Sequence, residues 1–428
     1  MSETENKKVL IITYYWPPAG GPGVQRWLKF AKYLTEFGWE PIIYTPENPS
    51  YPLLDESLVK EIPQGIKTVK TKIWEPYQLA EKLSKSNKKF KGGQFDVGEN
   101  QSWKSKLSIW VRGNFFIPDA RVFWVKPSVK FLTKYLQENT IETLVTTGPP
   151  HSMHLIGLEL KKQFPNLKWI ADFRDPWTQI SYYKHLKLTA SSDKKHRRLE
   201  QSVFHNADIT LATSYTDAEN FAKDGANSVC ITNGFDTEVG KEHPKSEKFV
   251  LSYVGVLEQL RNPEILWNVL DEIISENNDF KNDFQLKFVG RVDDKILNTI
   301  ESTSIRNNII NKGYLKHSEA YEEMKSSTLL LITNFPQTTS KGIIPGKIFE
   351  YLATGKTLLS FGPKDADVER ILNETHAGKH FDYENKSQLK NFLLEQYQLW
   401  KSHGISTQIR DISQFSRRNL TQKLSKIL

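Results

Sequence analysis

The sequence predicts an α/β protein with two domains, each built on a largely parallel sheet that is covered by helices on both faces. Apolar runs of strand length alternate with amphipathic helical segments, and this pattern restarts after a polar linker. Strands separated by helices pair in parallel because each crossover returns the chain to the same edge of the sheet. The length of 428 residues suits two or three domains at roughly 100–200 residues each.

The first domain opens with a strand at 8–14, a glycine-rich loop at 15–23 and a helix that ends near Gly38. The apolar residues of that helix share one face, as expected for a helix packed on a sheet: Val24, Trp27, Leu28, Ala31 and Leu34. Further strands of this domain are predicted at 41–45, 141–146, 169–173 and 209–212.

A linker is predicted at 232–248, where glycine and proline lie among charged residues. The pattern after it predicts strands at 249–254, 285–289, 328–333 and 357–361, and helices at 263–274, 345–353, 387–400 and 408–427. We therefore expect an N-terminal domain over 1–240 and a C-terminal domain over 246–404. The C-terminal helix, within 405–428, is expected to pack back onto the first domain.

Positive charge is concentrated in one segment of the chain. The net charge is +8, whereas residues 60–134 alone hold 16 Lys and Arg against 6 Asp and Glu, which gives +10. A local basic segment indicates an anionic partner such as a membrane surface or a pyrophosphate-bearing acceptor, or else a solvated lysine-rich loop. Five lysines and two adjacent glycines in 82–100 favour a mobile loop.

Aromatic and basic residues alternate in Trp103–Lys134, which suits a helix lying at a membrane interface. The residues concerned are Trp103, Lys104, Lys106, Leu107, Trp110, Val111, Arg112, Phe115 and Phe116. A pair of core helices in the first domain is the alternative.

The location is expected to be cytoplasmic, with peripheral contact at the inner face of the cell membrane. No apolar run reaches the roughly 18 residues of a spanning helix, and no secretory signal is visible. The single cysteine, Cys230, cannot form an internal disulfide.

The loop after the first strand contains Gly20, Gly21 and Gly23 and leads directly into a helix. Glycines let the backbone approach a ligand, and a helix N-terminus offers free N–H groups to an anion. A purely structural tight turn is the alternative. The spacing is not G-x-G-x-x-G, which disfavours a nicotinamide dinucleotide.

The second domain repeats this arrangement. Gly255 ends a strand and Arg261 is expected to open a helix, where a cation is unfavourable unless an anion binds. Gly346 starts a short helix in which Glu350 lies one turn later beside apolar residues. A carboxylate there suits the paired hydroxyls of a ribose, the alternative being an exposed surface glutamate.

Charged residues also follow a strand of the first domain. Asp172, Arg174 and Asp175 come at its carboxyl end, where open α/β sheets bind ligands. Three charges in four positions are costly to bury unless they pair or bind something. His151 and His154 follow another strand, and each suits either a hydrogen bond to a ligand hydroxyl or a structural role.

Together these segments resemble glycosyltransferase family 4, whose members have the GT-B fold with two Rossmann-like domains facing across a cleft. The resemblance covers nearly the whole chain. It rests on Tyr14–Val24, Asn233-Gly234-Phe235-Asp236, Tyr253-Val254-Gly255 with Arg261-Asn262, Phe349–Gly355, and Ala171–Trp177. The last segment resembles members that act in bacterial surface-polysaccharide synthesis.

The resemblance implies a retaining, hexosyltransferase-like enzyme that moves a sugar from a nucleotide diphosphate sugar to a saccharide acceptor, which we expect to be lipid-linked. Donor binding falls on Gly20, Gly21, Gly255, Arg261, Gly346, Lys347 and Glu350, and catalysis on Asp172, Arg174, Asp175 and His151. No metal or other cofactor is expected. A sugar-nucleotide epimerase on the same fold and a non-catalytic nucleic-acid-binding protein are the alternatives, although no recognised nucleic-acid-binding module is present.

Two positions depart from the family pattern. Val256 stands where an arginine often follows the donor-phosphate glycine, so Arg261 and Lys347 are expected to supply the positive charge. Gly342 stands where the family's E-x7-E pattern has its first acid, so the usual contact with the donor sugar is missing.

Overall fold

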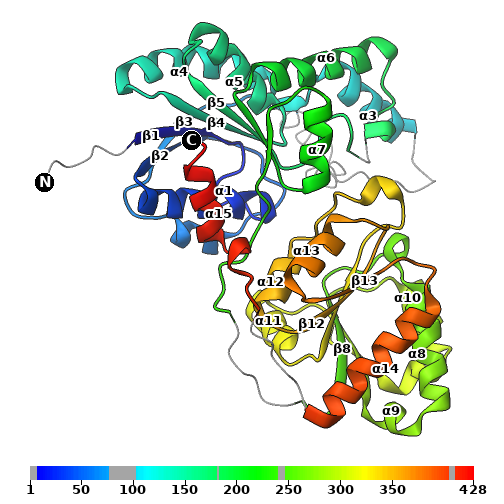
Figure 1. Cartoon of the computed structure of the whole chain (residues 1–428). Helices are drawn as coiled ribbons and strands as arrows, with labels where there is room; N and C mark the ends of the chain where they lie inside the picture. The colour runs from blue at the N-terminus through cyan, green and yellow to red at the C-terminus, as the bar shows by residue number, and fades with distance from the viewer. Residues whose placement is uncertain (1–6, 77–102, 181–182, 240–245, 404–409) are drawn as a thin grey trace, which may run out of the picture. The chain divides into compact units, whose positions relative to one another are not determined.

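The computed structural model describes residues 7–76, 103–180, 183–239, 246–403 and 410–428. The chain divides into two compact units (Figure 1). Unit 1 comprises Met1–Asn233 with Arg417–Leu428, and unit 2 comprises Gly234–Ser416. The loop expected at 82–100 lies outside the described residues.

Unit 1 is built on a seven-stranded sheet in the order β3-β2-β1-β4-β5-β6-β7, with every neighbouring pair parallel. Its strands are β1 (Lys7–Ile12), β2 (Trp39–Pro46), β3 (Lys67–Thr71), β4 (Thr143–Gly148), β5 (Lys168–Phe173), β6 (Ile209–Ala212) and β7 (Ser228–Cys230). Its helices are α1 (Pro22–Leu34), α3 (Trp103–Phe115), α4 (Val125–Asn139), α5 (Ser152–Gln163), α6 (Ala190–Asn206), α7 (Tyr215–Lys223) and α15 (Arg417–Ser425).

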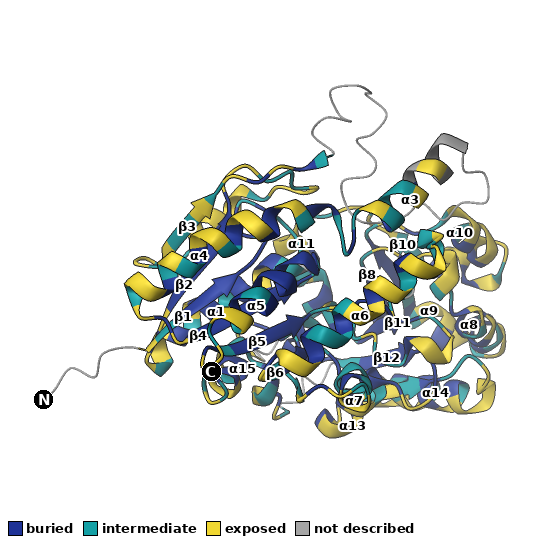
Figure 2. Ribbon diagram, turned by 90° about the horizontal axis from the view of Figure 1, so that it is seen from above, coloured by how far each residue is buried: buried dark blue, intermediate teal, exposed yellow. Residues whose placement is uncertain are grey.

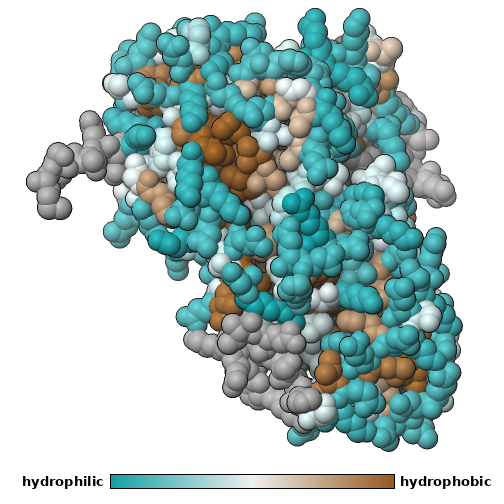
Figure 3. All heavy atoms as spheres, viewed as in Figure 1, coloured by the Kyte–Doolittle hydropathy of each residue, from teal (hydrophilic) through white to brown (hydrophobic). Residues whose placement is uncertain are grey.

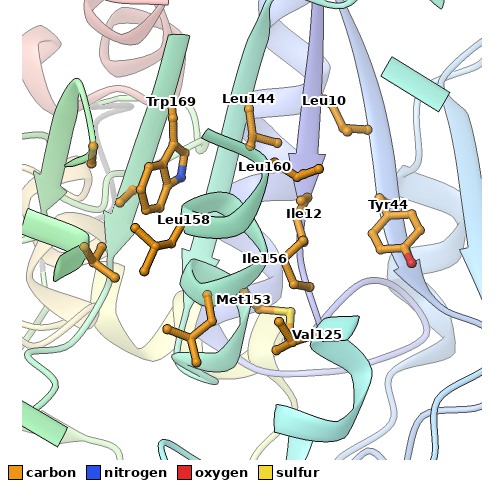
Figure 4. Close-up of a cluster of buried hydrophobic side chains, with 14 of the residues drawn as sticks. Leu10, Ile12, Tyr44, Val125, Leu144, Met153, Ile156, Leu158, Leu160 and Trp169 are labelled. Carbon is orange, nitrogen blue, oxygen red and sulfur yellow. The ribbon is translucent and has the colours of Figure 1, made fainter. Parts of the chain in front are cut away.

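Both faces of this sheet are apolar because its strands are buried on two sides. In β1, Leu10 and Ile12 join the cluster formed with α4, α5, α6 and α7, part of which is drawn in Figure 4. Val9 and Ile11 point to the other face and join the cluster with α1 and α15. This alternation follows from the two-residue repeat of a strand.

Unit 2 has a six-stranded parallel sheet in the order β10-β9-β8-β11-β12-β13. Its strands are β8 (Phe249–Val254), β9 (Phe284–Val289), β10 (Ile309–Asn311), β11 (Leu329–Thr333), β12 (Thr357–Phe361) and β13 (Gly378–Phe381). Its helices are α8 (Glu264–Glu276), α9 (Asn278–Asp283), α10 (Asp294–Glu301), α11 (His317–Lys325), α12 (Lys347–Ala353), α13 (Asp367–Thr375) and α14 (Lys386–His403). The predicted fold class, two parallel-sheet α/β domains, is confirmed.

Figure 2 shows the central strands of both sheets buried, while the outward sides of the covering helices are exposed. Hydrophilic side chains cover most of the surface in the view of Figure 3. In the described part of the chain, no helix has the length and apolar character needed to cross a bilayer.

The C-terminal segment differs from its prediction. A helix over 408–427 was expected, but the described residues form a short 3-10 turn at Ser413–Phe415 and then α15 at Arg417–Ser425. α15 packs beside α1, where Leu420 and Leu424 complete the apolar cluster of unit 1 (Figure 1). Ser416 instead pairs with Phe235 in unit 2, so the helix is interrupted where the chain passes from one unit to the other.

Candidate functional site

Each sheet has one position where its strand order reverses, and the predicted site residues follow the strands at that position. In unit 1 the reversal lies between β1 and β4, and in unit 2 it lies between β8 and β11. Connections on either side of such a point leave toward opposite faces, which opens a crevice beyond the carboxyl ends of the strands. We describe each unit separately.

The glycine loop of unit 1 leads into α1 without a side-chain cap. Gly21 is the N-cap residue, its φ is 101°, and the first turn of α1 contains no acidic residue. The first N–H groups of α1 therefore receive no cap from a side chain and remain suited to an anion. Gly20 has a second role, because a Cβ there would lie 3.0 Å from Leu53, which packs against this loop.

Arg174 lies at this same helix terminus. A Cβ on Gly23 would come within 1.7 Å of Arg174 Nη1, so a larger residue in the first turn of α1 would displace the guanidinium. Arg174 donates from Nε to the carbonyl oxygen of Gly148 at 3.2 Å and from Nη2 to that of Pro149. Arg174 is far from the glycine loop in the sequence, but in the structure its guanidinium lies beside Gly23 at the start of α1. The guanidinium and the helix N-terminus together form a region of positive charge.

Asp172 is fully buried and anchors α1 to the sheet. Its carboxylate accepts hydrogen bonds from Arg26 Nη2 at 2.9 Å, Trp27 Nε1 at 2.6 Å and Thr147 Oγ1 at 2.8 Å. Burial acts to raise the pKa of Asp172, but the charge and hydrogen bonds of Arg26, with the bond from Trp27, lower it below its ordinary value. A carboxylate with no exposed oxygen does not reach a substrate, and we assign Asp172 a positioning role.

A second buried ion pair holds the start of the glycine loop. Glu75 accepts from Tyr14, which follows β1, at 2.8 Å, and its Oε1 lies 3.0 Å from Arg121 Nε. The other Glu75 oxygen accepts the backbone N–H of Ser50 at 2.8 Å. These contacts join three loops at the carboxyl edge of the sheet.

His151 and His154 form a neutral pair next to Gly148. His154 Nδ1 lies 2.9 Å from Thr146 Oγ1, while His154 Nε2 and His151 Nδ1 are buried without a hydrogen-bond partner. A Cβ on Gly148 would lie 2.7 Å and 3.1 Å from these two atoms, so both point to one spot. Burial lowers the pKa of His154 to about 3 and that of His151 well below its ordinary value. Neither imidazole carries charge at neutral pH.

Asp175 is exposed at the start of the loop that follows β5. Among the four residues predicted as catalytic, the structure therefore buries Asp172 and leaves Asp175 accessible. Arg174 and His151 both lie close to the backbone of Gly148.

In unit 2, Lys347 lies over the end of β8. Its Nζ donates to the carbonyl oxygen of Val254 at 2.9 Å and lies 3.7 Å from the ring centre of Tyr253. A Cβ on Gly255 would be 3.4 Å from this ammonium group, and the φ of Gly255 is 122°. No carboxylate of the described residues pairs with Lys347. Burial, followed by the charge of Arg261, lowers the pKa of Lys347 to about 7.

Arg261 is the second cation of this cluster. It ends a 3-10 turn, Gln259–Arg261, three residues before α8 begins, so the expected conflict with a helix N-terminus is wrong. Its Nη2 reaches back to the carbonyl oxygen of Val256 at 3.1 Å and to Glu258 at 3.2 Å. Arg261 Nε is buried without a hydrogen-bond partner, and the guanidinium carbon lies 5.5 Å from the ring centre of Phe335. Arg261 thus places positive charge beside the backbone of Val256.

Glu350 lies one turn along α12 from Lys347, on the same side of that helix. Its Oε1 lies 3.0 Å from His317 Nε2, at the start of α11, and the Glu350 side chain is 31% exposed. The hydrogen bond to Glu350 raises the pKa of His317. Gly346, before Lys347, has open space where a Cβ would project. The five donor residues predicted in unit 2 are therefore gathered at the carboxyl ends of its central strands.

Sequence reasoning missed the partners that fix these groups. Arg26 and Trp27 lie 146 and 145 residues from Asp172, and His317 lies 33 residues from Glu350. The sequence did contain one indication for Arg26. It stands within an apolar helix face, and a cation buried there requires a partner of opposite charge. No comparable signal identified His317.

No protein-family model matches the chain, and no curated protein matches it. Solved structures match along almost its whole length. A mutant of S. aureus TarM, in complex with Fondaparinux, alpha-GlcNAc-glycerol and UDP, has a TM-score of 0.55 at 11% identity, with 98% of this chain and 99% of that chain covered. A glycosyltransferase from Rickettsia africae has a TM-score of 0.55 at 14% identity, covering 99% and 97%.

A putative UDP-N-acetylglucosamine 2-epimerase from Listeria monocytogenes has a TM-score of 0.52 at 12% identity, covering 98% and 95%. These similarities show that the chain has the GT-B fold of two Rossmann-like domains. Membership of family 4 stays a prediction.

Replacing Asp172 with leucine is expected to destabilise unit 1 by about 3–5 kcal/mol, because Arg26 then remains buried without its partner. Asp172→Asn is expected to cost less, since an amide still accepts the bond from Trp27. The measurement is the urea unfolding transition of each variant. Asp175→Asn, at an exposed position, is the matched control and should leave the transition in place.

The ion pair also predicts acid sensitivity. Because the folded-state pKa of Asp172 is lowered, its contribution is complete above the unfolded-state value of about 4 and is lost as the pH falls through the folded-state value. The difference in unfolding free energy between wild type and Asp172→Asn should therefore shrink below about pH 4. A difference that stays constant from neutral pH into strong acid would contradict this assignment.

Proposed function

We propose that the protein is a glycosyltransferase that uses a nucleotide diphosphate sugar as donor and a saccharide as acceptor. The observation that carries the proposal is the paired cations of unit 2, Arg261 and Lys347, with Glu350 one turn further along α12. Both cations lie at the strand-order reversal of the sheet, where α/β folds bind nucleotides. The GT-B fold supports the same class of reaction.

The donor diphosphate is the ligand that this cluster suits. Lys347 has no anionic partner among the described residues, and Arg261 has a buried Nε without a hydrogen-bond partner. A diphosphate supplies the negative charge that Lys347 lacks and an oxygen that accepts a hydrogen bond from Arg261 Nε. Negative charge also grows on the diphosphate as the sugar departs, so fixed cations stabilise the transition state more than the ground state.

Glu350 is proposed to bind the ribose. His317 occupies one carboxylate oxygen of Glu350, and the side chain is partly exposed. A carboxylate held from one side can accept a hydroxyl hydrogen bond on the other. The open space beside Gly346 allows a ligand to approach the start of α12 closely.

Unit 1 is proposed to bind the acceptor and an anionic group. Arg174 and the uncapped N-terminus of α1 offer positive charge, and Asp175 offers an exposed carboxylate. His151 is neutral, so its role is hydrogen bonding to a hydroxyl and not charge compensation. Retention of anomeric configuration is a part of the proposal that the resemblance suggests.

A lipid-linked acceptor at the inner face of the cell membrane is the finer proposal, in a pathway of cell-surface polysaccharide synthesis. Unit 1 exposes large apolar side chains on and around α3: Trp74 is 51% exposed, Leu107 50%, Trp110 36%, Phe115 68% and Phe123 43%. Trp74 and Phe123 are in edge contact at 4.8 Å, as are Trp110 and Phe115 at 5.8 Å. Exposed aromatic residues within a basic segment suit an anionic bilayer surface.

The epimerase is the second candidate, because one similar structure is a putative UDP-N-acetylglucosamine 2-epimerase. Both reactions need a nucleotide sugar, but they give different products. Incubation with nucleotide sugars in the absence of acceptor, followed by mass spectrometry and NMR of the sugar, separates the two. A new epimer would favour the epimerase, and sugar transfer to an added saccharide would favour the transferase.

Removing the Lys347 ammonium group is expected to weaken nucleotide diphosphate binding at least tenfold at about pH 6.5, where the lysine is charged. The variant is Lys347→Met, which keeps the length of the side chain, and calorimetry with UDP, GDP and ADP gives the dissociation constants. Arg261→Met should act in the same direction. Lys379→Met removes an exposed lysine of β13 and should have no effect. Unchanged binding in both Lys347→Met and Arg261→Met would rule the proposed donor site out.

Binding of UDP is expected to weaken as the pH rises above about 7. The free lysine loses its proton near this pH, whereas a bound diphosphate stabilises the charged form, so binding takes up a proton. UDP itself is already ionised in this range. Calorimetry from about pH 6.5 to about pH 9, in buffers of different ionisation enthalpy, measures the uptake, and Lys347→Met should abolish it. An affinity independent of pH would contradict the assignment.

Membrane contact is expected to depend on the exposed aromatic residues of α3. The double variant Trp110→Ser/Phe115→Ser should lose at least tenfold in flotation with vesicles of anionic phospholipid at low salt. Leu399→Ser, at a 47% exposed position on α14 of unit 2, is the control and should float like wild type. Failure of the wild-type protein to float would remove the membrane part of the proposal and leave donor binding untouched.

A further inference from the structure

Helix α6 holds the loop that follows β5 through two buried residues. His196 and Glu200 lie one turn apart on this helix, with exposed fractions of 2% and 4%. Trp177 donates from Nε1 to His196 Nδ1 at 3.0 Å. Thr178 donates its backbone N–H to one Glu200 oxygen at 3.0 Å and its hydroxyl to the other at 2.5 Å. Two consecutive loop residues are thus fixed by two residues of one helical face.

The contact with Trp177 determines the protonation of His196. An indole N–H only donates, so His196 Nδ1 must accept and the ring proton lies on Nε2. Nε2 lies 3.4 Å from the carbonyl oxygen of Gly113, which is an acceptor and therefore suits a donor at this position. His196 is therefore a neutral imidazole that joins α3 to the loop after β5.

The indole held in this way supports a residue of the site. The His151 ring stacks on Trp177 with a centroid distance of 5.0 Å and an interplanar angle of 6°. His151 Nδ1 is buried and has no hydrogen-bond partner. The rings of Phe173 and His154 also lie near His151, but Trp177 is the one stacked parallel to it, so the orientation of the imidazole follows that of the indole. Asp175 lies two residues before Trp177, on the same loop.

We propose that His196 and Glu200 are positioning residues of the acceptor side: they fix Trp177 and Thr178, and through them the His151 ring and the exposed Asp175. Neither needs to touch the substrate. The consequence for catalysis rests on the proposed function, but the effect on His151 can be observed without any reaction. A purely structural role for α6 would lower stability while leaving the His151 environment of the folded protein unchanged.

The test compares variants that lose the hydrogen bond with variants that keep it. His196→Phe keeps a ring of similar shape and removes the acceptor, whereas His196→Asn retains a carbonyl acceptor. Glu200→Leu removes both acceptors, whereas Glu200→Gln retains them in part. His205→Phe, at an exposed position near the end of α6, is the control.

The readout is the Cε1–H NMR resonance of His151 in the full chain labelled with 13C-histidine, assigned by its disappearance in His151→Gln. Because the ring current of Trp177 acts on the stacked imidazole, we expect this resonance to move by at least about 0.2 ppm in His196→Phe and Glu200→Leu. It should stay within about 0.05 ppm of wild type in His196→Asn, Glu200→Gln and His205→Phe, where the stacked pair is retained. An unmoved resonance in folded His196→Phe and Glu200→Leu would overturn the proposal.

Two further measurements keep the outcomes distinct. Should His196→Phe or Glu200→Leu fail to fold, Thr178→Val, which removes one hydroxyl, replaces it and is expected to move the same resonance.

UDP binding to each variant is measured by calorimetry and should stay within twofold of wild type, because the cation cluster belongs to unit 2. Failure of wild type to bind UDP would refute the proposed function, whereas the His151 resonance still decides the positioning role.

Discussion

The buried ion pair between Arg26 and Asp172 is the contact on which the site of unit 1 depends. An isolated carboxylate is costly to bury, so Asp172 requires the guanidinium and indole groups that α1 supplies. This requirement fixes α1 against β5. Once α1 is fixed, its first turn lies beside Arg174, and a side chain larger than glycine at position 23 would displace the guanidinium. One buried charge pair thus places the uncapped start of α1 beside Arg174.

Unit 2 also presents positive charge at the carboxyl edge of its sheet, but no buried ion pair in the described part of the chain positions it. Lys347 is held by a backbone carbonyl and an aromatic ring, and no carboxylate of the described residues pairs with it. Arg261 pairs with the exposed Glu258, but its buried Nε has no hydrogen-bond partner. Burying Lys347, and placing it close to the charge of Arg261, both disfavour its charged form and lower its pKa. A ligand with two negative charges offsets both effects. This is the physical basis for proposing a diphosphate and not a neutral ligand.

The loop after β5 joins the two kinds of residue that a ligand site needs. Asp172, near the end of the strand itself, is buried and holds the scaffold, while Asp175, at the start of the loop, is exposed. Between them the backbone turns away from the sheet, and α6 holds the following residues through His196 and Glu200. Charged side chains three residues apart therefore serve different purposes, and the difference comes from their burial.

The sequence by itself determined the strand–helix alternation, the two parallel sheets and the segments that lie at their carboxyl ends. These follow from local apolar periodicity and from glycine positions, which short stretches of sequence record. Only the tertiary structure decided that Asp172 is a scaffold residue, that Arg174 belongs with the glycine loop, and that Arg261 lies in a 3-10 turn before its helix. Burial and pairing depend on residues far away in the chain, as with Arg26 and Asp172, which are 146 positions apart, and no local pattern encodes such a contact.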